Sequence, residues 1–381
     1  MYDFDTPIDR SRSGSIKWDK YAGTDILPLW VADMDFAMPP PIQAALRSHL
    51  SNGDLGYGHP PAELAPLVAD FIAVTHGWQI DPDWIVWLPG LVCGLNVSCR
   101  AFGAAGVATL TPVYPPFLTA PGHAGQPLAT VAMLDDGRGW QIDWPQLRCT
   151  LQPGQLLLLC NPHNPVGRAY RNDELQALAQ LADEFDLIVC ADEIHADLIL
   201  DPQRRHIPFA SLDAASAERT VTLMAPSKTF NIPGLGCAFA IAANPRLRRR
   251  LLQAMAGIVP HPNSLAWPGA MAAYRDCRDW RLDLLDYLRG NLSLLQAEVA
   301  SLPGLKMHAV EATYLAWIDC RALGLAQPQV FFETHGLGFS DGRDFGAPGF
   351  VRFNFGCPRS RLQQALQRLR QAVLSLRQST P

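Results

Sequence analysis

Residues 187–198 have the sequence LIVCADEIHADL, an apolar run that ends in two carboxylates and a histidine. The pattern recurs, since LLLLC at 156–160 precedes the loop NPHNPVG and VTLMA at 221–225 precedes the loop PSKTFNIPGL. Near-continuous apolar runs of this length are typical of strands that are buried on both faces of a parallel sheet. Because ligands of open α/β sheets bind at the carboxyl ends of the strands, the three polar loops predict a common site.

The middle of the chain alternates between strand-like runs and helical patterns. Asn172–Phe185 carries apolar residues at one-turn spacing, which predicts a helix that covers the sheet. The predicted strands are Trp84–Leu88, Val107–Leu110, Leu128–Met133, Leu156–Cys160, Leu187–Ala191, Thr220–Met224 and Cys237–Ala242. We therefore predict an α/β fold with a mostly parallel sheet sandwiched by helices.

The last hundred residues have a different pattern, typical of a smaller α+β lobe. A long helix is predicted over 276–301, and the strands and helices expected after it are Lys306–Val310, Tyr314–Asp319, Gln327–His335, Phe350–Phe355 and Ser360–Leu376. The proline-rich segment ILPLWVADMDFAMPPP is expected to be extended and to wrap or join the two lobes. The predicted organisation is an N-terminal arm that is part of the small domain (1–45), a large cofactor domain (46–275) and a C-terminal small domain (276–381).

Composition excludes several classes of protein. Of 381 residues, 48% are hydrophobic and 18% charged, as in globular chains, and no apolar run is long enough to span a membrane. A net charge of −5 gives no electrostatic reason to expect nucleic acid or an anionic membrane as partner. Nine scattered cysteines without a C-x-x-C pair, and a polar start unlike a signal peptide, predict reduced thiols in a cytoplasmic protein. No His, Cys and Asp set has the spacing of metal ligands.

Lysine is scarce, which narrows the search for a reactive amine. The four lysines are Lys17, Lys20, Lys228 and Lys306, and of these Lys228 follows a predicted buried strand. Near it we expect an asparagine loop, the carboxylate at Asp192 and the helix N-terminus that LPGLVCGL opens at Gly90. This set predicts a site for a planar, phosphorylated, aromatic cofactor that is bound covalently to an amine.

Motifs along nearly the whole chain resemble those of fold-type I pyridoxal-phosphate enzymes, the aspartate-aminotransferase-like class I/II. Within that class the chain is similar to cystathionine β-lyases and related carbon–sulfur lyases, on the combination of KWD, WVADMDF and DEIHADL. In family order the motifs are IKWDKY (16–21), PLWVADMDF (28–36), GYG (56–58), TPVYPPF (111–117), NPHNPVGR (161–168), DEIHADL (192–198), SKTFNIPGL (227–235), EATYLAWID (311–319) and RFNFGCPR (352–359).

The resemblance implies roles for the residues around the cofactor ring. Lys228 matches the Schiff-base lysine, and the alternative is an ordinary surface lysine. Asp192 matches the carboxylate that keeps the ring nitrogen protonated, against the alternative of a helix cap. Asn164 and His195 match groups on the phenolic oxygen, while Glu193, Asn161 and His163 are interpreted as structural. Tyr114 matches the aromatic that stacks on the ring, with plain core packing as the alternative.

Other matches concern the phosphate and the substrate. Backbone N–H groups at Gly90, Leu91 and Val92, together with Ser227, are expected to bind the phosphate. Two positions depart from the broader class, because Ala225 and Gly236 stand where a serine and an arginine are usual. Tyr57 matches a tyrosine that reaches the phosphate from the neighbouring subunit, which implies a homodimer with shared active sites. Arg352 matches the arginine that binds the substrate α-carboxylate, over which the backbone of Val31–Ala32 closes, and Asn164 is expected to contact the same group.

Three functions are compatible with these residues. The first is a carbon–sulfur β-lyase that cleaves L-cystathionine or another cysteine S-conjugate to a thiol, pyruvate and ammonia, with Lys228 removing the Cα proton. The second is an aminotransferase of the same fold, in which Lys228 returns that proton to the cofactor. The third is a pyridoxal-phosphate-binding regulator without catalysis.

Overall fold

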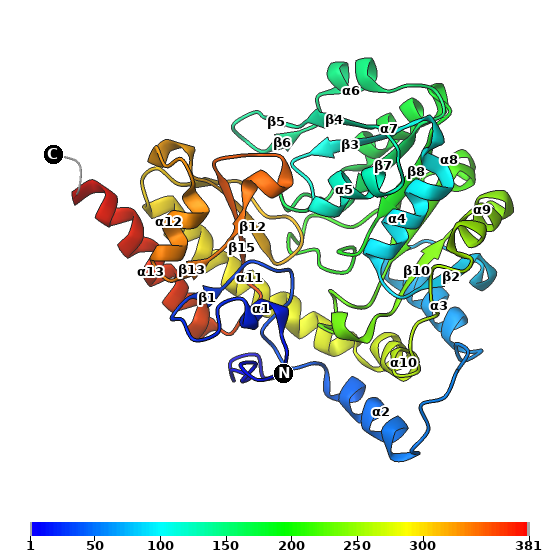
Figure 1. Ribbon diagram of the computed structural model, residues 1–381, viewed down its shortest axis with the longest axis horizontal. Coiled ribbons are helices and arrows are strands. Elements are labelled where there is room, and N and C mark those ends of the chain that lie inside the picture. The colour runs from blue at the N-terminus through cyan, green and yellow to red at the C-terminus, as the bar shows by residue number, and fades with distance from the viewer. Residues whose placement is uncertain (1, 379–381) are drawn as a thin grey trace.

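The computed structural model describes residues 2–378 and has two lobes (Figure 1). The larger lobe contains a seven-stranded sheet in the order β2-β10-β9-β8-β7-β3-β4. Its strands are β2 (Ile85–Leu88), β3 (Val107–Thr111), β4 (Leu128–Ala132), β7 (Leu156–Cys160), β8 (Ile188–Asp192), β9 (Thr220–Met224) and β10 (Ala238–Ile241). Five of the strands, β9 through β4, pair in parallel, whereas β10 runs antiparallel to both β2 and β9. The predicted α/β sheet is therefore confirmed.

Alternate residues of the central strands enter different hydrophobic clusters. Leu156 and Leu158 of β7 pack in one cluster, whereas Leu157 and Leu159 pack in another on the opposite face of the sheet. Because both faces are buried, the strand needs an apolar residue at every position. The helices of this lobe are α2 (Pro40–Ser51), α3 (Leu64–His76), α4 (Leu91–Phe102), α5 (Pro115–His123), α6 (Trp144–Thr150), α7 (Asn172–Glu184), α8 (Ala214–Arg219), α9 (Pro245–Met255) and α10 (Ala266–Asp276).

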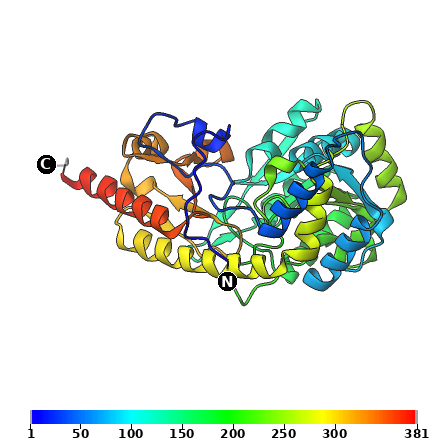
Figure 2. The ribbon, with the colours of Figure 1, turned by 90° about the horizontal axis from the view of Figure 1, so that it is seen from below.

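The smaller lobe has a four-stranded antiparallel sheet in the order β11-β12-β15-β14. The strands are β11 (Lys306–Met307), β12 (Leu315–Asp319), β14 (Ser340–Asp341) and β15 (Phe350–Asn354), with helices α11 (Arg278–Ser301), α12 (Pro328–Thr334) and α13 (Arg359–Gln378). Figure 2 shows α11, in yellow, running from beneath the large lobe along the small one, with α13 beside it.

The N-terminal arm joins the small lobe through backbone pairing. Strand β1 (Leu27–Pro28) pairs in parallel with β13 (Leu337–Gly338), so the proline-rich start is extended, as predicted. The predicted division at 45/46 falls inside α2, which packs against α10 of the large lobe, and that at 275/276 falls at the end of α10. Within residues 2–378, no helix combines the length and apolar character that crossing a membrane requires.

Candidate active site

The loops that follow β7, β8 and β9 meet at one edge of the large sheet. Asp192 is the last residue of β8, and Cys160 and Leu223, the residues aligned with it on the two neighbouring strands, lead into the loops that carry Asn164 and Lys228. Beside Lys228 lies a cavity of about 720 Å³ between the N-terminal arm and the loop after β9. Its walls include Lys17, Val31, Asp33, Met38, Asn231 and Leu235.

The Lys228 amine lies where the large lobe meets the arm. It donates a hydrogen bond to the backbone carbonyl of Ala32 at 2.5 Å, and the Tyr314 hydroxyl of the small lobe donates to the same oxygen at 3.1 Å. Burial lowers the pKa of Lys228 to about 8, with Arg352 acting in the same direction and Asp33 and Asp192 against it. A lysine with this pKa is neutral in a substantial fraction of molecules near neutral pH and is able to act as a nucleophile or base.

Asp192 is a buried carboxylate without a cationic partner at contact distance. It is 5% exposed and accepts a hydrogen bond from the backbone N–H of Ile194 at 3.1 Å. Burial, with a contribution from Glu193, raises its pKa to about 7, although the Ile194 N–H and Lys228 lower it. Among residues 2–378 no basic side chain lies within 4.0 Å of this carboxylate. A cationic group of a ligand at this place would restore the ionised form.

Arg352 lies on β15 and faces the loops of the large lobe. Its guanidinium donates to Asn164 Oδ1 at 3.0 Å, to the carbonyl of Trp30 at 2.7 Å and to Ser340 Oγ at 3.3 Å, and it stacks over the Phe345 ring. It is 4% exposed, its Nε has no partner in the described chain, and burial lowers its pKa to about 10. A planar fork with a free N–H suits a substrate carboxylate.

The structure brings His195 and Tyr114 to the same edge of the sheet. His195 is buried, its Nδ1 has no hydrogen-bond partner among the described residues, and burial lowers its pKa to about 3, so the ring is neutral. Tyr114 precedes α5, and its backbone N–H donates to the carbonyl of Asn164 at 3.1 Å. Burial raises the pKa of Tyr114, on which Arg352 and Asp192 also act, so its hydroxyl lies near both.

The predicted phosphate site has an open helix N-terminus. Gly90 precedes α4, and a Cβ added to it would meet no atom within 4 Å. Gly236 has a φ of +62°, and a Cβ there would lie 3.1 Å from the carbonyl oxygen of Pro89. A long side chain at position 236 would therefore strain the turn that leads into α4, which accounts for the missing arginine. Ser227 is half-buried and Ala225 is buried.

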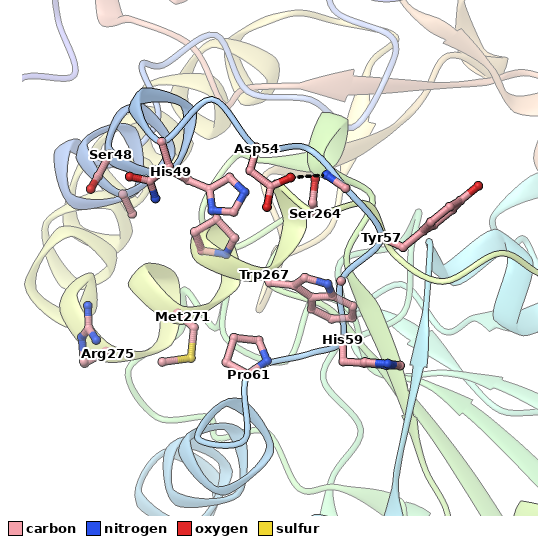
Figure 3. A pocket seen from close by; sticks show the side chains of 15 residues that line it. Ser48, His49, Asp54, Tyr57, His59, Pro61, Ser264, Trp267, Met271 and Arg275 are labelled. Carbon is pink, nitrogen blue, oxygen red and sulfur yellow. Dashed lines mark hydrogen bonds between the residues drawn. The ribbon is translucent and has the colours of Figure 1, made fainter.

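Tyr57 is the predicted site residue that does not join the others within one chain. It lies between α2 and α3 and is fully exposed, at 113%. Figure 3 shows its ring pointing away from a cavity of about 560 Å³ that Trp267, Met271 and Pro61 line. Tyr57 does not line the cavity beside Lys228. Its side chain is therefore available to a second molecule rather than to its own site.

The residues interpreted as structural have internal partners. His163 Nδ1 lies 2.8 Å from the Tyr170 hydroxyl and its Nε2 lies 2.8 Å from the carbonyl of Pro112. The amide oxygen of Asn161 accepts from the Tyr170 backbone at 3.1 Å, and Glu193 lies 2.7 Å from His206 Nε2. These side chains hold the loops that carry Asn164 and Asp192.

Several residues of the site were not predicted from the sequence. Lys17 is buried and forms an ion pair with Asp35 at 3.0 Å, and Arg10 pairs with Asp33 at 2.6 Å on the wall of the cavity. Asn231, which has a φ of 54°, exchanges three hydrogen bonds with the backbone of residues 34–36. The available signal was a lysine in a short apolar context, KWD, in a chain with four lysines.

Comparison with known proteins agrees with this geometry. The model of the aminotransferase class I and II family matches residues 24–369. The chain belongs to this family. Cystathionine beta-lyase PatB of Bacillus subtilis (strain 168) is 35% identical over 390 residues, which cover 97% of this chain and 99% of that protein. The resemblance that the motifs indicate is confirmed at the level of the family.

Two solved structures of the same fold are similar over almost the full length. The crystal structure of OvoB has a TM-score of 0.96 and 48% identity, and covers 98% of this chain and 100% of that one. Cystalysin from Treponema denticola, whose crystal structure contains a pyridoxal 5′-phosphate cofactor, has a TM-score of 0.93 and 34% identity, with coverage of 99% and 100%. Family membership thus extends across both lobes of the chain.

The lowered pKa of Lys228 predicts how its amine reacts in the protein without cofactor. A lysine amine is nucleophilic when neutral, so labelling of Lys228 by an amine reagent should rise with pH and reach its midpoint near pH 8. Arg352→Gln removes a nearby cation and should move the midpoint upward. Peptide-resolved mass spectrometry measures both, and the profile of the exposed Lys20 should not shift in the variant. A midpoint above pH 10 for Lys228 would contradict the burial argument.

Proposed function

We propose that the protein is a pyridoxal-5′-phosphate-dependent carbon–sulfur β-lyase. Its substrate class is L-cystathionine and related cysteine S-conjugates, which it cleaves to a thiol, pyruvate and ammonia. Support comes from the relatives named cystathionine beta-lyase and from the neighbours whose crystal structures contain the cofactor or are described as carbon–sulfur lyases. The observation that carries the proposal is a buried amine of low pKa close to a buried carboxylate that lacks a cation.

The residues present fit the cofactor. Asp192 supplies the carboxylate for a cationic ring nitrogen, His195 Nδ1 is an unpartnered buried group for the phenolic oxygen, and the open N-terminus of α4 suits the phosphate. Asn164 and Tyr114 complete the ring site, and Ser227 the phosphate site. When bound, the cofactor supplies an aldehyde that condenses with amines and a ring that accepts electrons from Cα.

The side chains around the cofactor divide the remaining work. Arg352, held by Asn164 and the carbonyl of Trp30, binds the α-carboxylate of the substrate and so orients its Cα–H bond. The neutral amine of Lys228 removes the Cα proton, which is possible near neutral pH because of its lowered pKa. The arm closes over the substrate at Ala32, whose carbonyl contacts Lys228 before the substrate arrives.

An aminotransferase is the second candidate, because the family model that matches residues 24–369 is that of class I and II aminotransferases. The same side chains serve both reactions. They differ in where Lys228 delivers the proton: a lyase expels the sulfur substituent from Cβ, whereas an aminotransferase protonates the cofactor.

Product analysis with L-cystathionine distinguishes the two functions. The lyase should release pyruvate and ammonia with a thiol in equal amounts, without a 2-oxo acid acceptor being present. Borohydride treatment of the resting enzyme should fix the cofactor on Lys228, as peptide mapping would show. Dependence of turnover on an added 2-oxo acid, with retention of the C–S bond, would favour the aminotransferase. Attachment of the cofactor to Lys17, Lys20 or Lys306 would refute the assignment of the site.

We also propose a homodimer in which Tyr57 reaches the phosphate of the partner's site. In support, Tyr57 is fully exposed and points away from its own chain, and the phosphate site lacks two contacts at Ala225 and Gly236. The nine free cysteines, of which seven are buried, favour a reducing cytoplasmic location. The net charge of −5 favours a small-molecule substrate, with neither nucleic acid nor a membrane surface as partner.

Mixed dimers test the shared site. Tyr57→Phe should weaken cofactor binding roughly ten- to a hundredfold, since one charge-assisted hydrogen bond is lost. When Tyr57→Phe chains are mixed with Lys228→Ala chains, one site of each mixed dimer combines both lesions and the other has none. Activity should therefore return, up to about half that of a wild-type dimer. Mixed dimers that form without any gain in activity would place Tyr57 in its own subunit's site.

A further inference from the structure

A second buried carboxylate, Asp197, lies in the loop after β8, two residues beyond His195. Its side chain is 7% exposed, and groups from three other segments converge on it. His76 Nε2 lies 2.9 Å and a guanidinium nitrogen of Arg281 3.6 Å from Oδ1, while the hydroxyl of Thr229 donates to Oδ2 at 3.1 Å. Thr229 directly follows Lys228 in the chain and is 0% exposed.

The partners of Asp197 are themselves fixed. His76 is the last residue of α3, and Arg281 lies in the first turn of α11 with its guanidinium over the ring of Phe71. The ring of His76 meets that of His206 edge-on at 5.2 Å. Since His206 pairs with Glu193, two carboxylates of the loop that carries Asp192 and His195 are anchored by adjacent histidines.

These partners keep Asp197 ionised in the interior. Burial by itself raises the pKa of a carboxyl group, yet the contacts with His76, Arg281 and Thr229 hold the pKa of Asp197 below its usual range. An ionised carboxylate with a fixed position is a strong acceptor for the Thr229 hydroxyl. The hydrogen bond therefore ties the Lys228 loop to the Asp192 loop at the residue next to the reactive amine.

We propose that Asp197 is a positioning residue for Lys228 and acts through the hydroxyl of Thr229. The inference deepens the proposed function and rests on it for the role of Lys228. The long lysine side chain does not fix its amine by itself, so the direction of the Cα–Cβ bond determines where the amine lies relative to Asp192 and Ala32. A displacement on the order of 1 Å costs up to about a hundredfold in rate when reacting groups must be aligned.

The chain offers a matched control for this hydrogen bond. Thr222 lies in β9, the strand that leads to Lys228, and is also 0% exposed. Its hydroxyl has no hydrogen-bond partner in the described part of the chain. Thr222→Val and Thr229→Val make the same chemical change in the same lobe, but only the second removes a hydrogen bond. Thr229→Ser keeps the hydroxyl and should restore the bond.

The test uses pyridoxal, which lacks the phosphate, as a probe of the full-length protein freed of cofactor. The rate at which borohydride-reducible pyridoxal accumulates on Lys228 is measured for each variant by peptide mapping, beside kcat with saturating cofactor and the melting temperature. For Thr229→Val we expect trapping and kcat to fall about tenfold, as expected for the loss of one hydrogen bond to a charged group. Thr222→Val and Thr229→Ser should stay within roughly threefold of wild type. Asp197→Asn, which keeps the side-chain volume, should slow trapping in the same way as Thr229→Val.

Two results would overturn the proposal. One is a Thr229→Val protein that traps pyridoxal at the rate of Thr222→Val. The other is a lower melting temperature with wild-type trapping and kcat per folded molecule, which would make the bond purely structural. If Thr229→Val does not fold, Asp197→Asn decides by the same comparison. Slow trapping in a protein family that releases no pyruvate from L-cystathionine would leave the positioning role intact and refute the proposed lyase function instead.

Discussion

The burial of the Asp192 carboxylate at the end of β8 is the constraint on which the site depends. A carboxylate that is 5% exposed and has no basic side chain at contact distance is costly to keep ionised, and its pKa is raised to about 7. The parallel sheet places it there because β8 is covered on both faces. A ligand with a cationic ring nitrogen satisfies this carboxylate, and the amine that would hold such a ligand, Lys228, lies on the neighbouring loop.

The two lobes and the arm are joined close to the same amine. The carbonyl oxygen of Ala32 accepts hydrogen bonds from Lys228 of the large lobe and Tyr314 of the small lobe, while Asn231 ties the backbone of residues 34–36 to the Lys228 loop. Movement of the small lobe therefore acts on the environment of Lys228 directly. Arg352 lies on that lobe, so binding of a substrate carboxylate couples lobe closure to the reacting centre.

The sequence predicted what depends on local pattern and missed what depends on distant partners. Strands β7 and β9 have the predicted bounds because every residue in them is buried, and the polar loops after them meet as expected. The antiparallel direction of β10 and the pairing of β1 with β13 were not predictable, since both follow from tertiary packing. Likewise, the ion pairs of Lys17 and Arg10 join residues of an arm with no periodic pattern. The direction of Tyr57 became apparent only from its exposure.

The most direct test of this account compares pyridoxal phosphate with its deaza analogue, in which a carbon replaces the ring nitrogen. Binding of each to the wild-type protein and to Asp192→Asn is measured by calorimetry, which gives a thermodynamic cycle for the contact between nitrogen and carboxylate. If Asp192 pairs with the ring nitrogen, the wild type should prefer the natural cofactor roughly ten- to a hundredfold, and Asp192→Asn should lose most of that preference. An equal preference in the two proteins would show that Asp192 does not contact the ring nitrogen and would contradict the account.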